Sequence, residues 1–437
     1  MTQAVRRRRS SGLVFVVLTA VLAVLASACS DGHHELRAQP SAGWSSFGGS
    51  GSNANFTYAG VPDDLRLSWT RPAGGRVLAQ VAINSGGDVA STSQAPSGCD
   101  FQVLDQRSGR KNFCRRLGTE SALNTAFYDN LGQPYIGKAG LFVAYSSGGA
   151  IRWRLPTAGL GLSAKSAGPG RLLVATTGGQ VLLVDTQTGD LAAPQKRYRP
   201  KPTEADPTAG VAQCPAGGPE CAIAAPPAVD VGTSRAFLNV FPQGAKNSQL
   251  TALTYADADG AERIAPLWTA DLGGGMAGPA SLSADGRTVY AFGRDGKLYA
   301  VDAANGKVRW SHQLDGSGFA TLSVSPDGTL VPSGRVGSPL TILHDDGDHA
   351  TEVARRDDVQ LAGVGTQTAA GTAWSVVRDG PDEQLVLTEF DTKSGQTKRT
   401  LPLPDASGFS TGVAVSATGQ LVVAATSGTV YFFDRRP

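Results

Sequence analysis

Apolar and polar positions follow one another along this chain in short runs, and few segments carry the 3.6-residue apolar period of a helix. Two to four apolar residues are followed by Asp or a small polar residue, a short turn that ends in Gly, and often a Trp. The clearest copy runs from Leu298 to Trp310, with Asp302 and Gly306 in its turn. Short β-branched runs between Gly, Asp, Asn and Ser are typical of antiparallel strands, so the pattern predicts an all-β protein.

This sequence motif repeats at a nearly regular interval, which indicates a closed array of small sheets and suits a chain of 437 residues. Weaker copies also place Gly four residues after Asp, as in Asp105 and Gly109. The approximate bounds of the repeats are 77–117, 124–157, 162–193, 223–273, 276–314, 317–355, 361–402 and 408–437. We therefore expect an eight-bladed β-propeller over residues 61–437. Seven blades are the alternative, because the sixth and seventh repeats are degenerate.

The two ends of the predicted propeller complement each other. The last repeat stops at Asp434, where other repeats turn and add a final strand. The segment Leu65–Thr70 matches the final strands that contain Trp153, Trp268 and Trp310. We therefore expect the N-terminal strand to complete the last blade, because ring closure removes exposed sheet edges. The recurring Trp side chains are expected to pack between adjacent blades.

The N-terminal residues have the features of an export signal. Arg6–Arg9 precede an uncharged apolar run, Leu13–Leu25, which is short for a membrane span and typical of a signal peptide. The run ends in Leu-Ala-Ser-Ala-Cys29, which resembles a bacterial lipobox and implies that Cys29 is lipidated. We expect residues 1–28 to be a lipoprotein signal peptide and the Gly/Ser-rich residues 29–60 to be a flexible tether. An ordinary signal peptide cut nearby is the alternative.

The cysteines agree with an exported protein. The turn after Asp105 places Cys99 and Cys114 opposite each other within one residue of register, at the separation that a disulfide requires. Cys214 and Cys221 close a small loop rich in Pro and Gly. A four-thiolate zinc site is the alternative, but the paired C-x-x-C spacing of such sites is absent. Two disulfides imply an oxidising compartment.

Net charge argues against one class of partner. The chain has 39 basic and 37 acidic residues, and removal of the four leader arginines leaves 35 basic residues. A mature chain that is slightly acidic and has no basic block gives no electrostatic basis for binding nucleic acid. We expect a monomer attached to the membrane through its N-terminal lipid.

A family resemblance rests on the clearest repeat. The phrase A-x-D-x-x-x-G-K-x-x-W at Ala300–Trp310 resembles the pyrroloquinoline-quinone-type propeller repeat. That repeat occurs in quinoprotein dehydrogenases and in non-enzymatic envelope proteins, among them the lipoprotein of the outer-membrane β-barrel assembly machinery. The resemblance covers about residues 65–437 and implies the fold more strongly than a function.

The candidate chemistry is sparse. The quinoprotein enzymes need calcium-binding carboxylate and amide groups, a catalytic Asp and often two adjacent Cys, and no such set can be matched here. We therefore expect no catalytic residues and no cofactor. His344, Asp346, Asp348 and His349 are metal-ligand types, but they lie where a turn of the sixth repeat is expected, so a solvated loop is favoured over a metal site.

An insertion at residues 194–222 interrupts the repeat period and has its own predicted disulfide. Long ordered loops often bind partners, and a cluster of Arg, Lys and Tyr suits such contacts. The candidate partner-binding residues are Lys196, Arg197, Tyr198, Arg199 and Lys201. A solvated insertion without a role is an equal alternative.

The sequence as a whole indicates an extracytoplasmic binding or scaffolding module, lipid-anchored to the bacterial cell membrane on its periplasmic or cell-surface side. Its expected partner is an envelope protein, peptide or glycan. The alternative is a propeller enzyme with a cofactor or metal in the central channel, either a quinoprotein oxidoreductase or a metal-dependent lyase or hydrolase.

Overall fold

The computed structural model describes residues 37–200, 206–315, 319–334, 338–380 and 382–435, which belong to one compact unit, Arg37–Pro437. Within these residues the regular secondary structure is almost entirely β-strand, with two short 3₁₀ helices, η1 (Thr119–Leu123) and η2 (Val211–Ala216). No helix among them is both long and apolar enough to cross a bilayer. The predicted all-β propeller class is confirmed.

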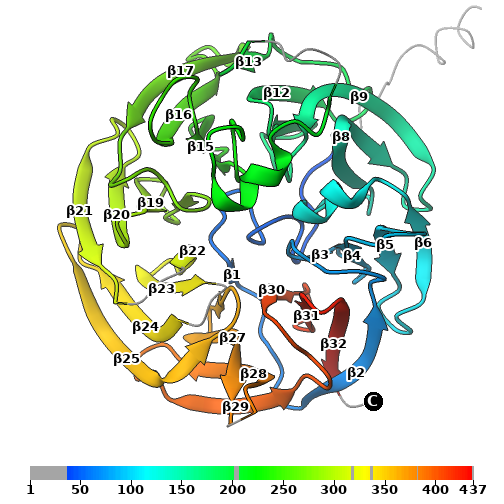
Figure 1. Cartoon of the computed structure of the whole chain (residues 1–437), viewed down its shortest axis with the longest axis vertical. Helices are drawn as coiled ribbons and strands as arrows, with labels where there is room; N and C mark the ends of the chain where they lie inside the picture. The colour runs from blue at the N-terminus through cyan, green and yellow to red at the C-terminus, as the bar shows by residue number, and fades with distance from the viewer. Residues whose placement is uncertain (1–36, 201–205, 316–318, 335–337, 381, 436–437) are drawn as a thin grey trace, which may run out of the picture. The chain divides into compact units, whose positions relative to one another are not determined.

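The strands form small antiparallel sheets that follow one another around a ring in chain order (Figure 1). The first sheet contains β3 (Ala82–Ile83), β4 (Val89–Thr92), β5 (Phe101–Leu104) and β6 (Lys111–Arg115). The second contains β7 (Phe127–Tyr128), β8 (Pro134–Tyr145) and β9 (Ile151–Leu160). The third contains β10 (Lys165–Ser166), β11 (Arg171–Ala175), β12 (Gln180–Asp185) and β13 (Lys196–Arg197). The next two contain β14 (Ala228–Asp230), β15 (Arg235–Val240), β16 (Gln249–Ala256) and β17 (Glu262–Ala270); and β18 (Ser281–Leu282), β19 (Thr288–Phe292), β20 (Lys297–Asp302) and β21 (Val308–Gln313).

A larger sheet of nine strands comes next. It combines two antiparallel sets, and β1 (Phe56–Thr57) pairs in parallel with the innermost strand of the second set. The sets are β22 (Phe319–Val324), β23 (Thr329–Gly334), β24 (Ser338–Asp345) and β25 (Ala350–Leu361), then β26 (Thr366–Thr368), β27 (Thr372–Asp379), β28 (Gln384–Asp391) and β29 (Thr397–Pro402). They join because Gln360 and Leu361 pair with Arg378 and Val377. Counted as separate units, the described strands make eight units around the ring.

The ring is closed by strands from both chain ends. β2 (Leu65–Pro72) pairs with β32 (Thr429–Arg435). β32 pairs in turn with β31 (Leu421–Ala425), and β31 pairs with β30 (Ser410–Val415). Arg66 lies opposite Asp434, and the Trp69 ring stacks on Phe432 with centroids 4.8 Å apart. The predicted pairing of the N-terminal strand with the last unit is therefore present.

Adjacent units contact each other through residues of the repeated sequence motif. Trp268 on β17 donates its indole N–H to the carbonyl of Ala303 in the next unit, at 3.1 Å. Gly306 in the same turn has φ of 77°, and a Cβ there would lie 2.6 Å from the Trp268 ring. The glycine is therefore required both by the turn and by the neighbouring indole. Trp69 and Trp153 make the equivalent contact with the carbonyls of Gln106 and Thr186.

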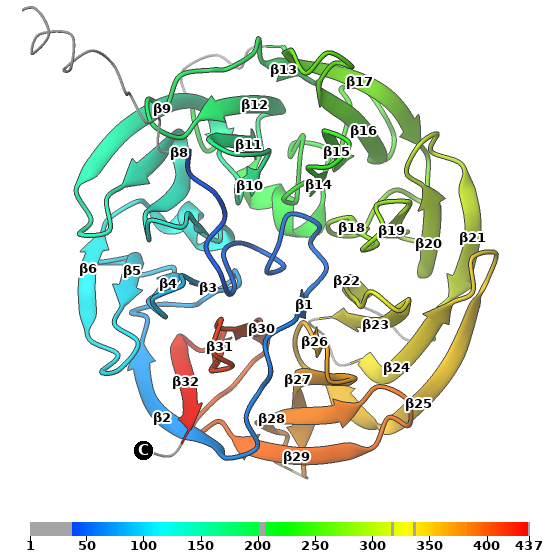
Figure 2. The ribbon, with the colours of Figure 1, turned by 180° about the vertical axis from the view of Figure 1, so that it is seen from behind.

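The centre of the ring contains the central segment, residues 41–57, which Figure 2 shows crossing one face in dark blue. Innermost strands of six units donate main-chain N–H groups to its carbonyl oxygens at 2.7–3.0 Å. The donor and acceptor pairs are Ile83 and Trp44, Tyr128 and Ser45, Val229 and Gly51, Leu282 and Ser52, Val324 and Ala54, and Gln367 and Asn55. The prediction of a flexible tether over residues 29–60 is therefore wrong for this segment, because its carbonyls are bound and Trp44 is only 1% exposed.

A buried lysine from the remaining inner strand completes these contacts. Lys165 on β10 is fully buried and donates to the carbonyl oxygens of Phe47 and, at 2.7 Å, Ser50. Its ammonium lies 5.6 Å from the centre of the Phe47 ring and 3.3 Å from the Ser46 hydroxyl. Burial lowers the pKa of Lys165 well below its usual value, since no described carboxylate pairs with it. The central segment is thus held by seven of the eight units.

Candidate functional site

A cavity of about 770 Å³ lies at the centre of the ring. Phe47 of the central segment lines it, together with connections that lead into innermost strands, such as Ala224–Pro226 and Met276–Pro279. The two figures show η2 and the central segment on opposite faces of the ring. The central segment therefore closes one mouth, and the cavity belongs to the other.

The cavity lining is mostly neutral. Small apolar residues alternate with hydrogen-bonding side chains that carry no charge, among them Thr125, Thr177 and Gln313. Asn239 donates its amide to the Gly278 carbonyl at 3.0 Å. Such a surface can hold a ligand through shape and hydrogen bonds, and it offers little general acid or base chemistry.

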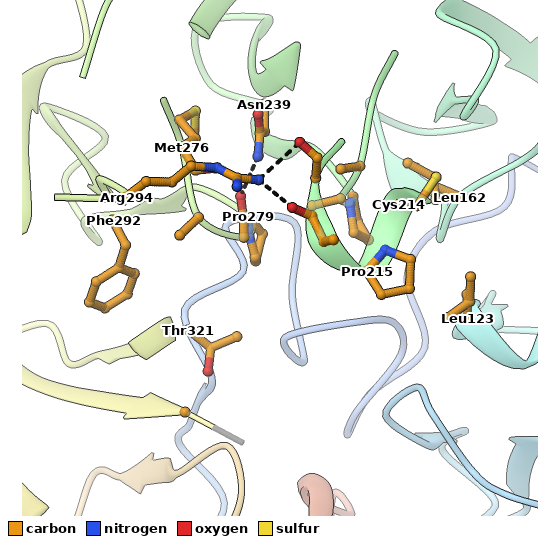
Figure 3. Close-up of a pocket in the computed structure, with 18 of the residues that line it drawn as sticks. Leu123, Leu162, Cys214, Pro215, Asn239, Met276, Pro279, Phe292, Arg294 and Thr321 are labelled. Carbon is orange, nitrogen blue, oxygen red and sulfur yellow. Dashed lines mark hydrogen bonds between the residues drawn. The ribbon is translucent and has the colours of Figure 1, made fainter. Parts of the chain in front are cut away.

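Two charged side chains lie at the cavity, Arg294 and Asp295, both exposed in the turn between β19 and β20. The Asp295 carboxylate accepts a hydrogen bond from the Tyr299 hydroxyl at 2.6 Å. Desolvation of Tyr299 and this bond raise the pKa of the phenol. Arg294 instead points across the mouth, where it donates to the carbonyl oxygens of Ala216 and, at 2.9 Å, Gly217 (Figure 3).

Those carbonyls belong to the disulfide loop, residues 206–222, which contains η2. The loop is compact because Cys214 and Cys221 are bonded and because Gly217 ends η2 with a left-handed φ of 57°. Cys214, Pro215 and Ala216 line the cavity. The disulfide loop thus forms part of the cavity wall, and Arg294 holds the C-terminal end of η2.

The predicted partner-binding cluster lies elsewhere. Lys196 and Arg197 form β13 and pair with β12, so they complete the third sheet. The interpretation of residues 194–222 as one continuous insertion is therefore wrong at its start. Tyr198 packs against buried apolar residues, and burial raises the pKa of its phenol to about 12. Arg199 donates to the carbonyls of Pro219, Glu220 and Phe241.

These contacts give the four residues structural partners, and their role in partner binding stays a prediction. Lys201 lies outside the described residues, as does the predicted lipidation site Cys29.

Both predicted disulfide pairings are present in the structure. The Cα atoms of Cys99 and Cys114 are 5.5 Å apart. The predicted register was wrong, however, because Cys114 pairs with Gln102 and Cys99 precedes β5. The chain reaches the bridge through a turn at Asp100, whose carboxylate accepts the main-chain N–H of Leu117 at 2.6 Å.

The histidines considered as weak metal candidates lie in and beside the turn between β24 and β25. His349 Nδ1 is 2.7 Å from the Asp348 carboxylate, and this bond raises the pKa of His349. His344 and His349 lie 3.8 and 3.5 Å from Asp346. No group of three or more His, Cys, Asp or Glu residues in the described part of the chain is arranged to hold a metal ion.

The cavity residues do not fit a quinone cofactor with calcium. Such a site needs several carboxylate and amide oxygens for the cation. Among the lining residues, Asp295 is the one carboxylate, and it already accepts from Tyr299. The Asn239 side chain bonds to Gly278 through its nitrogen.

Sequence reasoning missed Arg294 and Lys165. Arg294 lies in Gly-Arg-Asp-Gly, which resembles an ordinary hairpin turn. Lys165 is a single charge among Leu, Ser and Ala at the start of the third predicted repeat, and that isolation was the signal available. Its acceptors lie 115 or more positions earlier, so the pairing could not be inferred locally.

Comparisons with known proteins agree with this architecture. A family profile described as outer membrane protein assembly factor BamB matches residues 246–436. The crystal structure of BamB from Moraxella catarrhalis has a TM-score of 0.58 at 16% identity and covers 85% of this chain and 99% of its own. The quinohemoprotein alcohol dehydrogenase from Comamonas testosteroni has a TM-score of 0.60 at 14% identity and covers 96% and 85%. At such identities the two structures show a shared fold.

A full-length relative is more informative. Protein Rv3035 of Mycobacterium tuberculosis is 32% identical over 411 residues, which make up 93% of this chain and 99% of the relative. Together with the BamB-like profile and the propeller fold, this similarity shows that the chain belongs to the family of protein Rv3035, with a pyrroloquinoline-quinone-type propeller similar to BamB.

Proposed function

We propose that this protein is a lipid-anchored, extracytoplasmic propeller that acts as a binding or scaffolding module in the bacterial cell envelope. One observation carries the proposal. The ring has a cavity of about 770 Å³ at one mouth, with a mostly neutral lining suited to recognition, while its own chain occupies the other mouth.

Three further features support an envelope location. The leader and the lipobox-like sequence before Cys29 predict export and lipidation. The bonds Cys99–Cys114 and Cys214–Cys221 suit an oxidising compartment. The matching family profile carries the description of an outer membrane assembly factor, which is consistent with contact to envelope proteins.

Fractionation tests the anchor. We expect the wild-type protein to stay with membranes after a high-salt wash and to partition into detergent. The Cys29→Ala variant should be soluble or remain unprocessed, because it lacks the lipidated side chain. Exchange of the neighbouring Ser30 for Ala serves as the matched control and should behave like wild type. A Cys29→Ala protein that is processed and remains in membranes like wild type would refute the lipid anchor.

Affinity capture and a dye assay test the binding role. Partners captured from detergent-solubilised membranes by wild type should be depleted with the Cys214→Ser/Cys221→Ser variant, because that change loosens the cavity wall. Identical partner lists would remove the disulfide loop from the proposed site. Dye reduction after addition of pyrroloquinoline quinone and calcium would favour the oxidoreductase alternative instead.

A further inference from the structure

Arg294 has an unusual set of partners for a cation at a cavity. Its guanidinium contacts the carbonyls of Ala216 and Gly217, and its Nε lies 3.4 Å from the Met276 carbonyl. Arg294 makes no ion pair with a carboxylate in the described part of the chain. Neutral carbonyls are weaker partners for a guanidinium than a carboxylate, which accepts shorter, charge-assisted and often paired hydrogen bonds.

The lining beside Arg294 combines two kinds of surface. Leu78, Leu160, Leu162 and Met276 offer apolar contacts, whereas Thr125, Thr177, Gln313 and Thr321 offer neutral donors and acceptors. A purely hydrocarbon ligand would leave these polar groups without partners, at a cost in binding. An extended peptide can satisfy both, because apolar side chains alternate with main-chain N–H and carbonyl groups.

The opposite mouth already shows how this ring holds a segment of chain through main-chain hydrogen bonds, although that segment is bent and contains several turns. There the innermost strands donate N–H groups to carbonyls of the central segment, which contains no charged residue. The cavity differs by having two charged side chains at its edge. The Asp295 carboxylate accepts a hydrogen bond from the Tyr299 hydroxyl, whereas the Arg294 guanidinium faces neutral carbonyls. Charge complementarity at this mouth therefore favours a peptide with a carboxylate.

We propose that the cavity binds an extended acidic peptide segment of a partner protein, with one carboxylate bound to Arg294. Binding of that carboxylate replaces the carbonyls of Ala216 and Gly217 as partners of the guanidinium, so the C-terminal end of η2 moves away from Arg294. This inference rests on the proposed binding function and names the kind of partner for its site.

Two peptide libraries test the proposal directly. Each is a fluorescein-labelled, C-terminally amidated pentapeptide pool with a fixed central residue, Asp in one and Asn in the other, and no other acidic position. By fluorescence polarisation we expect the wild type to bind the Asp pool about tenfold more tightly, a difference of about 1.4 kcal/mol. Arg294→Gln should remove that preference.

Arg287→Gln is the matched control, because Arg287 and Arg294 lie beyond opposite ends of the same strand, Thr288–Phe292. The Arg287 side chain is 78% exposed, and we expect its variant to bind like wild type. Equal binding of both pools, no binding of either pool, or an Asp preference that survives Arg294→Gln would overturn the proposal. If the protein binds decanoate but neither peptide pool, the cavity is instead a site for a lipid carboxylate. Membrane fractionation is unaffected by these outcomes, so failure here is distinguishable from failure of the anchor.

Discussion

The two mouths of the ring are closed in different ways. At one mouth, the central segment accepts main-chain hydrogen bonds from inner strands of six units and contacts Lys165 of a seventh. At the other mouth, the C-terminal end of η2 is held across the cavity by one exposed side chain, Arg294, and Arg199 donates to the loop further along, at Pro219 and Glu220. Many buried main-chain bonds open only together, whereas one exposed side-chain contact can exchange partners at small cost. The comparison identifies one mouth as a structural closure and the other as a recognition surface.

Removal of the central segment should have the largest effect on stability. A variant that begins at Tyr58 leaves six inner-strand N–H groups and Lys165 without their acceptors. We expect a loss of about 5 kcal/mol or more in the free energy of unfolding, measured by urea denaturation. A variant that begins at Arg37 is the control and should unfold like wild type. A synthetic peptide of residues 38–58 should restore part of the lost stability.

Lys165→Met tests the buried lysine. The change removes the lysine donor from the carbonyls of Phe47 and Ser50 and from the Ser46 hydroxyl. The Ser46 hydroxyl, 3.5 Å from each carbonyl, remains as a donor to them, so we expect a loss of up to about 3 kcal/mol. Lys307→Met, in an exposed turn, should change stability by less than about 0.5 kcal/mol. Similar losses in the two variants would show that Lys165 does not hold the central segment.

The same lysine predicts a pH dependence. Burial lowers the pKa of Lys165 in the folded protein below the ordinary value of 10.5, whereas the unfolded chain keeps that ordinary value. Between the two values the unfolded chain binds more protons, so the folded state gains stability as pH rises. Urea midpoints at about pH 7.5 and about pH 9.5 should therefore diverge between wild type and Lys165→Met. Parallel midpoints would contradict the stated direction.

The disulfide loop should matter less for global stability. Loss of a bridge between residues seven positions apart, Cys214 and Cys221, is expected to lower the free energy of unfolding by about 2.5 kcal/mol at most. In Cys214→Ser/Cys221→Ser, amide exchange should accelerate in residues 206–222 and stay slow in residues 41–57. Faster exchange in both regions would show that the two mouths are coupled.

The smallest change should come from Arg294→Gln. Because the side chain is exposed, global stability should stay within about 0.5 kcal/mol of wild type. Exchange at the end of η2, residues 211–217, should nevertheless become faster, since the carbonyls of Ala216 and Gly217 lose their donor. Unchanged exchange there would mean that Arg294 does not hold the loop.

Sequence patterns predicted those parts of the fold that depend on local chemistry. The repeat from Ala300 to Trp310 contains the end of a strand, the Asp turn, the Gly and the indole that contacts the next unit. In the structure these residues belong to one hairpin, formed by β20 and β21. The last repeat lacks its final strand, and the segment around Trp69 matches that strand, so the repeat pattern also predicted that the two chain ends close the ring. The register of Cys99 was wrong because a turn at Asp100 interrupts the ladder, and sequence spacing does not reveal such a turn.

The sequence by itself determined the all-β class, the repeat, the meeting of the chain ends and the pairing of the cysteines, because each follows from contacts between neighbouring elements. The tertiary structure alone decided where the Gly/Ser-rich segment lies, that Lys165 is buried beneath it, and that Arg294 meets the disulfide loop. Small polar residues suit a solvated linker and a crowded centre equally well. Only ring closure supplies the distant donors that favour the second arrangement.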